Sequence, residues 1–400
     1  MEEPPKHASA RRRVRWFGAV VEHWRRWRAR HRRTLRVLLV LSLGLSTLVL
    51  PSYVRALTLP NSPGWRLRSA EWARDHYMGS ALDWSEWCWF MLRRGRLAQL
   101  PPVELSAFPA PHRVSIDMPP DVTQAAPDPV AVPFEHPLPG EGEWRAVGWV
   151  ANDTPVLRCT TFRPDPEHPR VAVGAARFTP ELTRFVLVPG TQDPGGDWLW
   201  HGSVPGRAQK RLVAAFNSGF RLLEAQGGMY VEGKVARPLV PEAASLVLDA
   251  AGSADIVAWH GGAEPTAPTT AVRQNLRLIV DGGKLATGLS RNSGSQWGFG
   301  RNQACHTWRS GLGISRDRAL LYVAGDGLTL MTLAEALKLA GAERAMELDI
   351  HDVWSTFNVF QPASRGRGKP RATKLLPTMP RSAERYLTPD DRDFIAAFIR

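Results

Sequence analysis

Residues 311–350 read GLGISRDRALLYVAGDGLTLMTLAEALKLAGAERAMELDI, and this segment decides the fold. Two apolar runs flank a polar turn at 316–317, which predicts an antiparallel pair of strands. The next run, LTLMTLAEALKLAGA, predicts a helix with Thr332 and Glu335 as a capping box and Gly341 at its end. ERAMELDI follows as a further strand. This order of strand, strand, helix and strand indicates an α+β fold.

Two acids, Glu347 and Asp349, stand near the end of the last predicted strand. Alternate residues of a strand share a face, so both acids are expected on one face. The other face would carry Met346, Leu348 and Ile350 against the preceding helix. Neighbouring carboxylates raise each other's pKa unless a cation or a hydrogen-bond donor lies between them. The spacing fits an ordinary solvated face as well as a functional site.

The remainder of residues 143–400 has the pattern of a sheet-rich domain. Short runs rich in Val, Phe, Trp and Thr alternate with Pro, Gly and Asp clusters, which predicts many short strands. Residues 276–285, LRLIVDGGKL, predict a hairpin because Asp-Gly-Gly adopts positive φ readily. We therefore expect a single catalytic-type α+β domain with few helices.

The N-terminal part has the features of a membrane anchor. Residues 1–33 hold eleven Lys and Arg against three acids, or +8 of the net charge of +13. The run Val37–Val54 has 18 residues without a charge, which predicts a transmembrane signal anchor at 34–56 that contacts lipid. The positive-inside bias puts 1–33 in the cytoplasm, making a single-pass plasma-membrane protein with an extracytoplasmic main domain. A cleaved signal peptide ending near Ala56 remains an alternative.

The basic segment itself predicts contact with the membrane surface. Trp16, Val20, Trp24 and Trp27 recur at helical spacing, which favours an amphipathic helix on anionic headgroups. A solvated arginine tail is the alternative. Nucleic acid is not an expected partner, because most of the charge lies in this segment and the chain has no nucleic-acid motif.

Two further segments precede the main domain. Residues 57–100 are Trp-rich and predict a helical juxtamembrane segment. Residues 101–142 hold eleven prolines, and proline lacks a backbone donor, so an extended linker is expected. Cys159 and Cys305 lie in the part of the chain expected outside the membrane, where a disulfide between them could form and leave Cys88 unpaired. The sequence fits free thiols equally well.

Polar residues follow apolar runs at three other places. Asn217 ends AAFN before a small-residue turn, where a backbone approaches a ligand closely. Arg309 opens the strand RSGLGI, and a guanidinium suits bidentate contact with phosphate. Asp326 ends LLYVAGD. Each has an ordinary explanation as well: a turn former, a surface salt bridge and an Asp-Gly turn.

Taken in chain order, AAFNSGF, VRQNLRLIVDGGK, WRSGLGIS and AGDGLTLMTLAEALKLAGAERAMELD resemble the phosphodiester glycosidase family over roughly residues 143–400. SAEWARDHYMGSALDWSEWCWF, TFRPDPEHP and RYLTPDDRDFIAAFIR are similar to its membrane-anchored actinobacterial branch. The family commonly has Asn-Leu-Asp followed by three glycines. Here Glu347 takes the first position, and Ile350, His351 and Asp352 replace the glycines.

The resemblance implies hydrolysis of a sugar-1-phosphodiester in a cell-envelope glycopolymer, with retention or inversion left open. The alternative is a catalytically inactive carbohydrate-binding or scaffold protein of the same fold. No cofactor or metal is predicted, and the metal requirement and oligomeric state stay open. The residues implied as catalytic are Asp349, Asp326 and Glu347, and those implied as substrate-binding are Arg309, Asn217, Ser355, Thr356 and His351.

Overall fold

A computed structural model describes residues 27, 31–58, 64–92, 94–115, 126–265, 268–290, 296–298, 304–363 and 368–400. The chain forms two compact units, Met1–Tyr77 and Met78–Arg400. Of the predicted surface helix at 16–27, all but residue 27 lies outside the described residues.

The first unit is helical. Its helices are α2 (Arg32–Leu57) and α3 (Trp65–Ala73), and η1 (Arg74–Met78) follows as a kink in which His76 and Tyr77 have non-helical backbone angles. Two hydrogen bonds join α2 to α3: the Tyr53 and Ser69 hydroxyls lie 2.7 Å apart, and Trp72 Nε1 donates to Ser52 Oγ at 3.1 Å. α2 includes the predicted membrane span. Within the described part of the chain, however, no helix is both long and apolar enough to cross a membrane.

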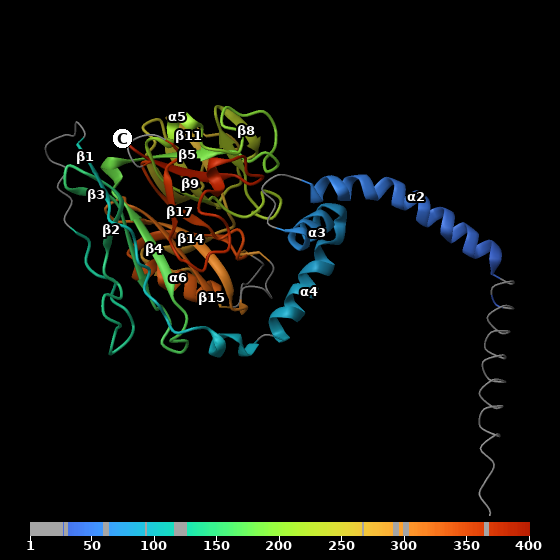
Figure 1. Cartoon of the computed structure of the whole chain (residues 1–400), viewed down its shortest axis with the longest axis horizontal. Helices are drawn as coiled ribbons and strands as arrows, with labels where there is room; N and C mark the ends of the chain where they lie inside the picture. Colours follow the sequence, from blue (N-terminus) through green and yellow to red (C-terminus); the bar gives the residue numbers. More distant parts are fainter. Residues whose placement is uncertain are drawn as a thin grey trace, which may run out of the picture. The chain divides into compact units, whose positions relative to one another are not determined.

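The second unit is built mainly from strands, which form three sheets (Figure 1). The nine-stranded sheet contains, in spatial order, β1 (His112–Val114), β2 (Arg145–Ala151), β3 (Thr154–Phe162), β4 (Val173–Phe178), β15 (Leu320–Leu328), β14 (Thr307–Ser315), β16 (Ala342–Asp349), β12 (Leu278–Asp281) and β13 (Lys284–Leu285). We call it sheet 1.

Sheet 2 contains β10 (Ala254–Ala258), β9 (Ala244–Asp249), β11 (Thr269–Gln274), β7 (Met229–Val231) and β8 (Lys234–Arg237). Sheet 3 contains β18 (Arg371–Lys374), β17 (Phe357–Gln361), β6 (Leu212–Asn217), β19 (Phe394–Ile399) and β5 (Thr183–Val188). The described helices of this unit are α4 (Gly79–Leu92), η2 (Arg94–Gln99), η3 (Pro180–Leu182), α5 (Gly206–Gln209), α6 (Leu330–Leu339) and η7 (Arg385–Leu387). The prediction of a sheet-rich α+β fold with few helices is therefore confirmed.

Sheet 1 lies between two apolar layers. On one side, Leu333 and Leu337 of α6 belong to a buried cluster with Leu321 and Val323 of β15. On the other side, a larger cluster includes Leu312 and Met346 of sheet 1 together with residues of sheets 2 and 3. Burying a leucine side chain fully contributes about 1.5–3 kcal/mol. The two clusters thus fix sheet 1 between α6 and the other sheets, and α6 lies beside β15 in Figure 1.

The predicted turns are confirmed. β14 and β15 form an antiparallel hairpin whose connection is residues 316–319. β12 and β13 pair Asp281 with Lys284, and Gly282 and Gly283 have φ of 55° and 69°. α6 ends before Gly341, whose φ of 98° is disfavoured for a residue with a side chain.

The predicted start of α6 is wrong by one turn. The N-cap is Thr329, whose hydroxyl accepts from the Thr332 backbone N–H at 3.1 Å. The Thr332 hydroxyl in turn accepts from the Thr329 N–H at 2.8 Å. Thr332 therefore completes the capping box at N3 instead of opening it, and Glu335 lies inside the helix. β15 ends at Leu328, so Thr329 is the residue with extended backbone at the boundary.

The described parts of the proline-rich segment contain a short strand, bends and turns, and they remain attached to the sheets. The Ser106 hydroxyl donates to the Leu375 carbonyl at 3.0 Å, and Glu141 is buried in an ion pair with Arg163 at 2.8 Å. β1 is a short strand inside this segment, parallel to β2. The domain boundary predicted at residue 143 therefore stays a prediction.

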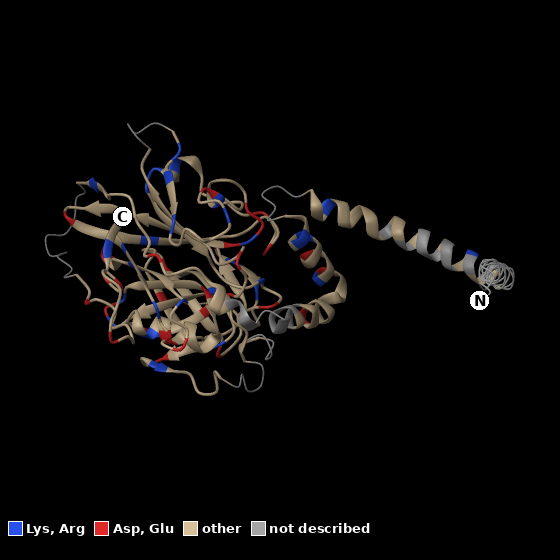
Figure 2. Cartoon of the chain, turned by 60° about the horizontal axis from the view of Figure 1, so that its bottom comes forward, with Lys and Arg blue, Asp and Glu red and all other residues tan. Residues whose placement is uncertain are grey.

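Charged residues of both signs are interspersed along residues 78–400 in Figure 2. All three cysteines are free thiols, and burial raises the pKa of Cys159 well above its ordinary range. The bridge considered between Cys159 and Cys305 is not formed in this structure.

Candidate functional site

A β-bulge separates the two acids of β16. In the pairing of β14 with β16, Gly311 is opposite Glu347 and Ser310 is opposite Asp349, with a register shift between them. Gly311 and Ser310 are neighbours and face opposite sides of the sheet, and so do the acids paired with them. The expectation that both acids share a face is wrong, because the extra residue, Leu348, interrupts the alternation.

Glu347 lies against Arg309 in a fully buried ion pair. Arg309 Nη1 donates to Glu347 Oε1 at 2.6 Å, and both side chains are 0% exposed. The same guanidinium donates through Nε to the Leu328 carbonyl and through Nη2 to the Cys305 carbonyl, at 2.9 Å and 3.2 Å. Burial raises the pKa of Glu347, and the charge of Arg309 opposes that rise. The predicted phosphate contact of Arg309 and the reacting role of Glu347 stay predictions.

Asp349 faces sheet 3. Its Oδ1 accepts from the Ile350 N–H at 2.8 Å, and its Oδ2 lies 3.4 Å from Nη2 of Arg392. The residue is 4% exposed. Burial raises the pKa of Asp349 to about 6, against the opposing charges of Arg392 and His351. A carboxyl with this pKa is mostly ionised at neutral pH and still able to accept a proton, which suits a base or nucleophile.

Asn217 connects the strands around Asp349. Its Nδ2 donates to Ser310 Oγ at 3.0 Å, and its Oδ1 accepts from Tyr322 OH at 2.9 Å and from the Thr356 N–H at 3.2 Å. Ser310 Oγ lies 3.4 Å from the Asp349 carbonyl oxygen. The side chain of Asn217 therefore holds β6, β14 and β15 to the segment after β16, at the predicted place at the end of an apolar strand.

The segment after β16 contains the other predicted residues. Ser355 is 0% exposed, with Oγ 3.5 Å from the Asp349 carbonyl oxygen. The Thr356 and Tyr386 hydroxyls lie 2.6 Å apart. His351 is exposed, and its Nδ1 lies 2.6 Å from Oδ1 of Asp352. Ser355 and Thr356 thus support the backbone, whereas His351 is at the surface beside Asp349.

Asp326 is the remaining predicted residue. It lies on β15, next to Gly325, and Gly325 pairs with Arg309 on β14. In sheet 1, β14 stands between β15 and β16. The structure therefore brings Asn217, Asp349, Ser355 and Thr356 together on the side of sheet 3, and Arg309 with Glu347 on the side of α6.

Sequence reasoning did not identify Arg392 or Trp354. Arg392 directly precedes the run Asp393-Phe394 that opens β19, and its guanidinium contacts both Asp349 and the Gly219 carbonyl, the latter at 3.3 Å. Its guanidinium carbon lies 4.7 Å from the centre of the Trp354 ring. The signal in the sequence is the dense run of charges TPDDRD immediately before a buried strand, where charges are normally paired.

That run forms a buried ionic layer under the site. Asp390 accepts from Nε and Nη2 of Arg385 at 2.6 Å and 2.9 Å, and the pair holds the pKa of Asp390 down at about 2. Arg385 also donates to Thr356 Oγ1 at 3.2 Å. Asp393 accepts from Nε of Arg273 at 2.7 Å, with both side chains 0% exposed. Buried ion pairs therefore pack beside the site.

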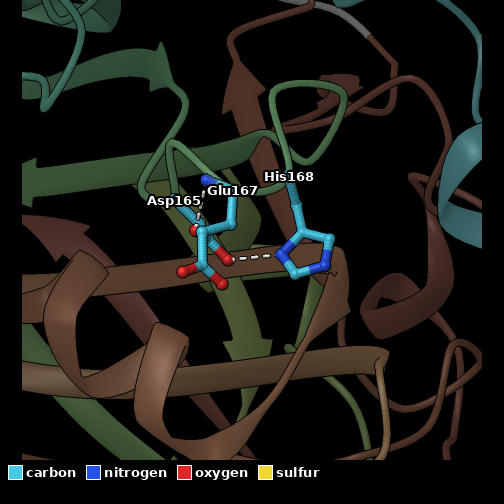
Figure 3. Close-up of side chains that lie close together, drawn as sticks. All are labelled: Asp165, Glu167 and His168. Atoms are coloured by element: carbon cyan, nitrogen blue, oxygen red, sulfur yellow. Dashed lines mark hydrogen bonds and ion pairs between the residues drawn. The ribbon is translucent and has the colours of Figure 1, made fainter.

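One group of side chains has the composition of a metal site. Asp165, Glu167 and His168, in the turn between β3 and β4, have ligand atoms within 4.8 Å of one another (Figure 3). Asp165 Oδ2 lies 2.6 Å from His168 Nδ1, and Asp165 Oδ1 accepts from the Glu167 N–H at 2.9 Å. These bonds within the turn account for the arrangement, and we assign no ion to it.

Three solved structures resemble the chain weakly. The catalytic domain of zebrafish N-acetylglucosamine-1-phosphodiester alpha-N-acetylglucosaminidase, auto-inhibited by its pro-peptide, has a TM-score of 0.42 at 14% identity, covering 62% of this chain and 85% of that one. A hypothetical protein from Synechocystis has 0.38 at 12%, covering 62% and 63%. A putative exported protein from Burkholderia pseudomallei has 0.30 at 12%, covering 57% and 74%. No functional statement follows from likenesses of this size.

No curated protein matches the chain. Residues 210–349 match the family model of the phosphodiester glycosidases, and this segment contains Asn217, Arg309, Asp326, Glu347 and Asp349. His351, Trp354, Ser355, Thr356 and Arg392 lie beyond its end. The chain is therefore similar to the phosphodiester glycosidase family through residues 210–349.

Proposed function

We propose that this chain is a membrane-anchored hydrolase that cleaves sugar-1-phosphodiester bonds in glycopolymers outside the plasma membrane. The observation that carries the proposal is Asp349: a buried carboxylate at the end of β16, with a pKa near 6 and a cation at 3.4 Å. It is the last residue of the segment that matches the family. Perturbed carboxyls of this kind are frequent in active sites.

The reaction needs little acid catalysis. Cleavage of the bond between the anomeric carbon and its oxygen releases a phosphate monoester, whose second pKa is about 6, so this leaving group departs without strong protonation. A carboxylate is needed near the anomeric carbon, either to attack it or to take a proton from the attacking water. In the proposal Asp349 has this role. Water supplies the new hydroxyl of the sugar, and its remaining proton passes to the carboxylate or to the departing phosphate.

We assign the second carboxylate and the phosphate-binding cation to the residues predicted from the sequence. Asp326 is the proposed partner of Asp349, Glu347 is a further proposed catalytic acid, and Arg309, which forms an ion pair with Glu347, is the proposed phosphate-binding cation; all lie within the segment that matches the family. Both members of that pair are buried in the structure, so contact with a substrate would require their ion pair to open. A structural role of the pair, which joins β14 to β16, requires no opening.

The location is part of the proposal. The uncharged run Val37–Val54 and the basic residues before it support an anchor at 34–56 with residues 1–33 in the cytoplasm. The main domain would then meet envelope polymers. Microscopy of a fluorescent fusion, combined with protease accessibility in intact cells, tests this orientation: residues 143–400 are expected to be digested from outside.

A second candidate function is binding without catalysis. His351 and Asp352 stand where the family commonly has glycines, and they form an exposed pair beside Asp349. Glycines let backbone amides approach an anion closely, and bulkier residues limit that approach. Binding of envelope glycopolymer by a chain that cleaves no phosphodiester would favour this function.

The test uses the purified full chain and the methyl phosphodiester of N-acetylglucosamine 1-phosphate, in water enriched in ¹⁸O. We expect release of methyl phosphate, with the label in the sugar hydroxyl because the carbon–oxygen bond breaks. Asp349→Asn is expected to lower kcat by at least about 100-fold, the size of a lost acid–base or nucleophilic group. The matched control is Asp281→Asn, in the exposed hairpin turn, where asparagine fits equally well.

Three results would contradict the proposal. Label in the phosphate would show that the phosphorus–oxygen bond breaks, as in a phosphodiesterase. Equal activity of Asp349→Asn and the control would remove Asp349 from the reaction. Absence of turnover on this substrate and on the corresponding glucosyl ester would favour the binding function.

A further inference from the structure

Arg392 contacts two chain segments that meet at Asp349. Its Nη2 lies 3.4 Å from Asp349 Oδ2, at the end of β16, and 3.3 Å from the Gly219 carbonyl oxygen, in the loop after β6. Its Nε lies 3.9 Å from Oδ2 of Asp193. Arg392 is 8% exposed, so these contacts form with little competition from water.

Trp354 limits the movement of this guanidinium. The Trp354 ring is 6% exposed, and the guanidinium carbon of Arg392 lies 4.7 Å from its centre. A cation over the face of an aromatic ring, shielded from water, is attracted electrostatically to the ring. The guanidinium carbons of Arg385 and Arg381 approach the same ring, at 5.0 Å and 5.6 Å. The ring therefore supports Arg392, whose Nη2 lies 3.4 Å from Asp349 Oδ2.

Gly219 must be a glycine for this arrangement. A Cβ at Gly219 would lie 2.1 Å from Nδ2 of Asn275, and the φ of 154° adds strain for other residues. Asn275 in turn donates to the Ser218 carbonyl at 3.0 Å and accepts from the Phe220 N–H at 3.0 Å. Asn275 thus bonds to the residues before and after Gly219, and so fixes the loop whose carbonyl contacts Arg392.

Other charged groups also act on Asp349. His351 lies in the same segment and favours the ionised carboxylate, whereas Glu224 disfavours it. Asp349 in turn raises the pKa of Glu347 on its own strand and of Tyr322 on β15. Among the cations named here, Arg392 is the strongest influence on the carboxyl after burial itself.

We infer that Arg392 is a positioning residue of the active site: braced by Trp354 and the Gly219 carbonyl, it orients the Asp349 carboxylate and keeps it charged for reaction. This inference rests on the proposed function. Arg392 is 43 residues beyond Asp349, where the family match ends, so the match does not assign it a role.

The first test is the pH dependence of kcat/KM for the full chain with the same methyl phosphodiester. The fall of kcat/KM on the acidic side of this pH profile, its acidic limb, reports the ionisation of Asp349. In Arg392→Gln the carboxylate loses its nearby cation, so the limb is expected to move up by about one pH unit, with about a fivefold loss at pH 6 and almost no loss at pH 8. Arg392→Lys keeps the charge and is expected to restore most of the shift. KM is expected to change little.

The control is Arg381→Gln. This substitution removes another guanidinium from the Trp354 face, together with its contact to Asp390 at 3.3 Å. The contact between Arg392 and Asp349 stays in place. Its acidic limb is expected at the wild-type position even if its melting temperature falls. A purely structural role of Arg392 would make the two glutamine variants alike, with lower stability and unchanged limbs, and this result would overturn the inference.

A second measurement needs no turnover. In full chain labelled with ¹³C-carboxyl aspartate, the resonance lost in Asp349→Asn identifies Asp349, and its titration is followed in wild type and Arg392→Gln. A higher midpoint in the variant supports the inference, and an equal midpoint overturns it. A large rise in KM with an unchanged midpoint would instead assign Arg392 to substrate contact. If wild type titrates as expected but has no turnover, the proposed function fails and the positioning of Asp349 by Arg392 stands.

Discussion

At the scale of single residues, burial of Asp349 has a cost in stability. The pKa of its carboxyl rises from 3.8 to about 6 on folding, so the folded state holds the proton more tightly than the unfolded state does. The folded state is therefore favoured most below pH 4, and this contribution is lost as the pH rises through 6. Functional sites commonly combine activity with such a local cost.

Asp349→Asn is accordingly expected to stabilise the protein at pH 8 while it abolishes activity. Two pKa units correspond to roughly 3 kcal/mol, and loss of the partner of Arg392 offsets part of this, which leaves a gain of about 1–2 kcal/mol. Denaturant unfolding at pH 5 and pH 8 measures it. The gain is expected to be smaller at pH 5, where the wild-type carboxyl is already mostly protonated. An equal loss of stability at both values would contradict the reasoning.

At the scale of elements, the bulge at the end of β16 makes two acids face opposite sides of sheet 1. It directs Glu347 to Arg309 on the side of α6 and Asp349 to Arg392 on the side of sheet 3. A strand with unbroken alternation would place both on one side. Bulges often occur beside active sites because they change the direction of a side chain without moving the strand.

The buried pair on β14 and β16 gives a prediction at this scale. Arg309→Met leaves the Glu347 carboxylate buried without its cation, and is expected to lower stability by about 3–5 kcal/mol. Arg309→Met/Glu347→Leu removes both charges and is expected to recover most of that loss. The control, Arg344→Met, breaks the partly exposed pair of β16 with Asp255 and is expected to cost less than about 1 kcal/mol.

Urea unfolding of the four proteins measures these differences. If the single and double variants at Arg309 lose equal stability, the pair is not what holds the two strands at this point. If the double variant regains stability but has no turnover, Arg309 and Glu347 also have the functional role predicted from the sequence.

At the scale of the whole second unit, the C-terminal run connects the sheets through charges. Asp390, bound to Arg385, lies under the segment that carries Trp354 and Thr356, and Asp393, bound to Arg273, joins β19 to β11. The pKa of Asp390 falls from 3.8 to about 2 on folding. Its contribution to stability is therefore present above pH 4 and is lost as the pH falls through 2.

Asp390→Asn is expected to destabilise the protein at pH 7 by about 3–5 kcal/mol, because Arg385 is left buried without a carboxylate. The difference from wild type is expected to shrink steadily as the pH is lowered from 4 to 2. Thermal unfolding across this range measures it. Asp153→Asn serves as control, since Asp153 is exposed and paired with exposed Arg113; a similar effect of both substitutions would contradict the prediction.

The sequence by itself determined the local elements of this protein. The hairpins, the helix α6 and the strand β16 follow from periodicity and turn residues, since each depends on neighbours within a few positions. It also predicted Asn217 and Asp349 as site residues, because a polar residue at the end of an apolar strand is conspicuous in any window of the chain. The resemblance to the phosphodiester glycosidases came from the order of such motifs.

Only the tertiary structure decided which residues meet. The bulge that separates Glu347 from Asp349 depends on pairing with β14, more than 30 positions away, and Arg392 reaches Asp349 from 43 positions further along the chain. The start of α6 at Thr329 likewise depends on where β15 ends. Local pattern fixes what a segment can form, whereas register, facing and ion pairing arise from packing between distant segments, and no short stretch of sequence contains that information.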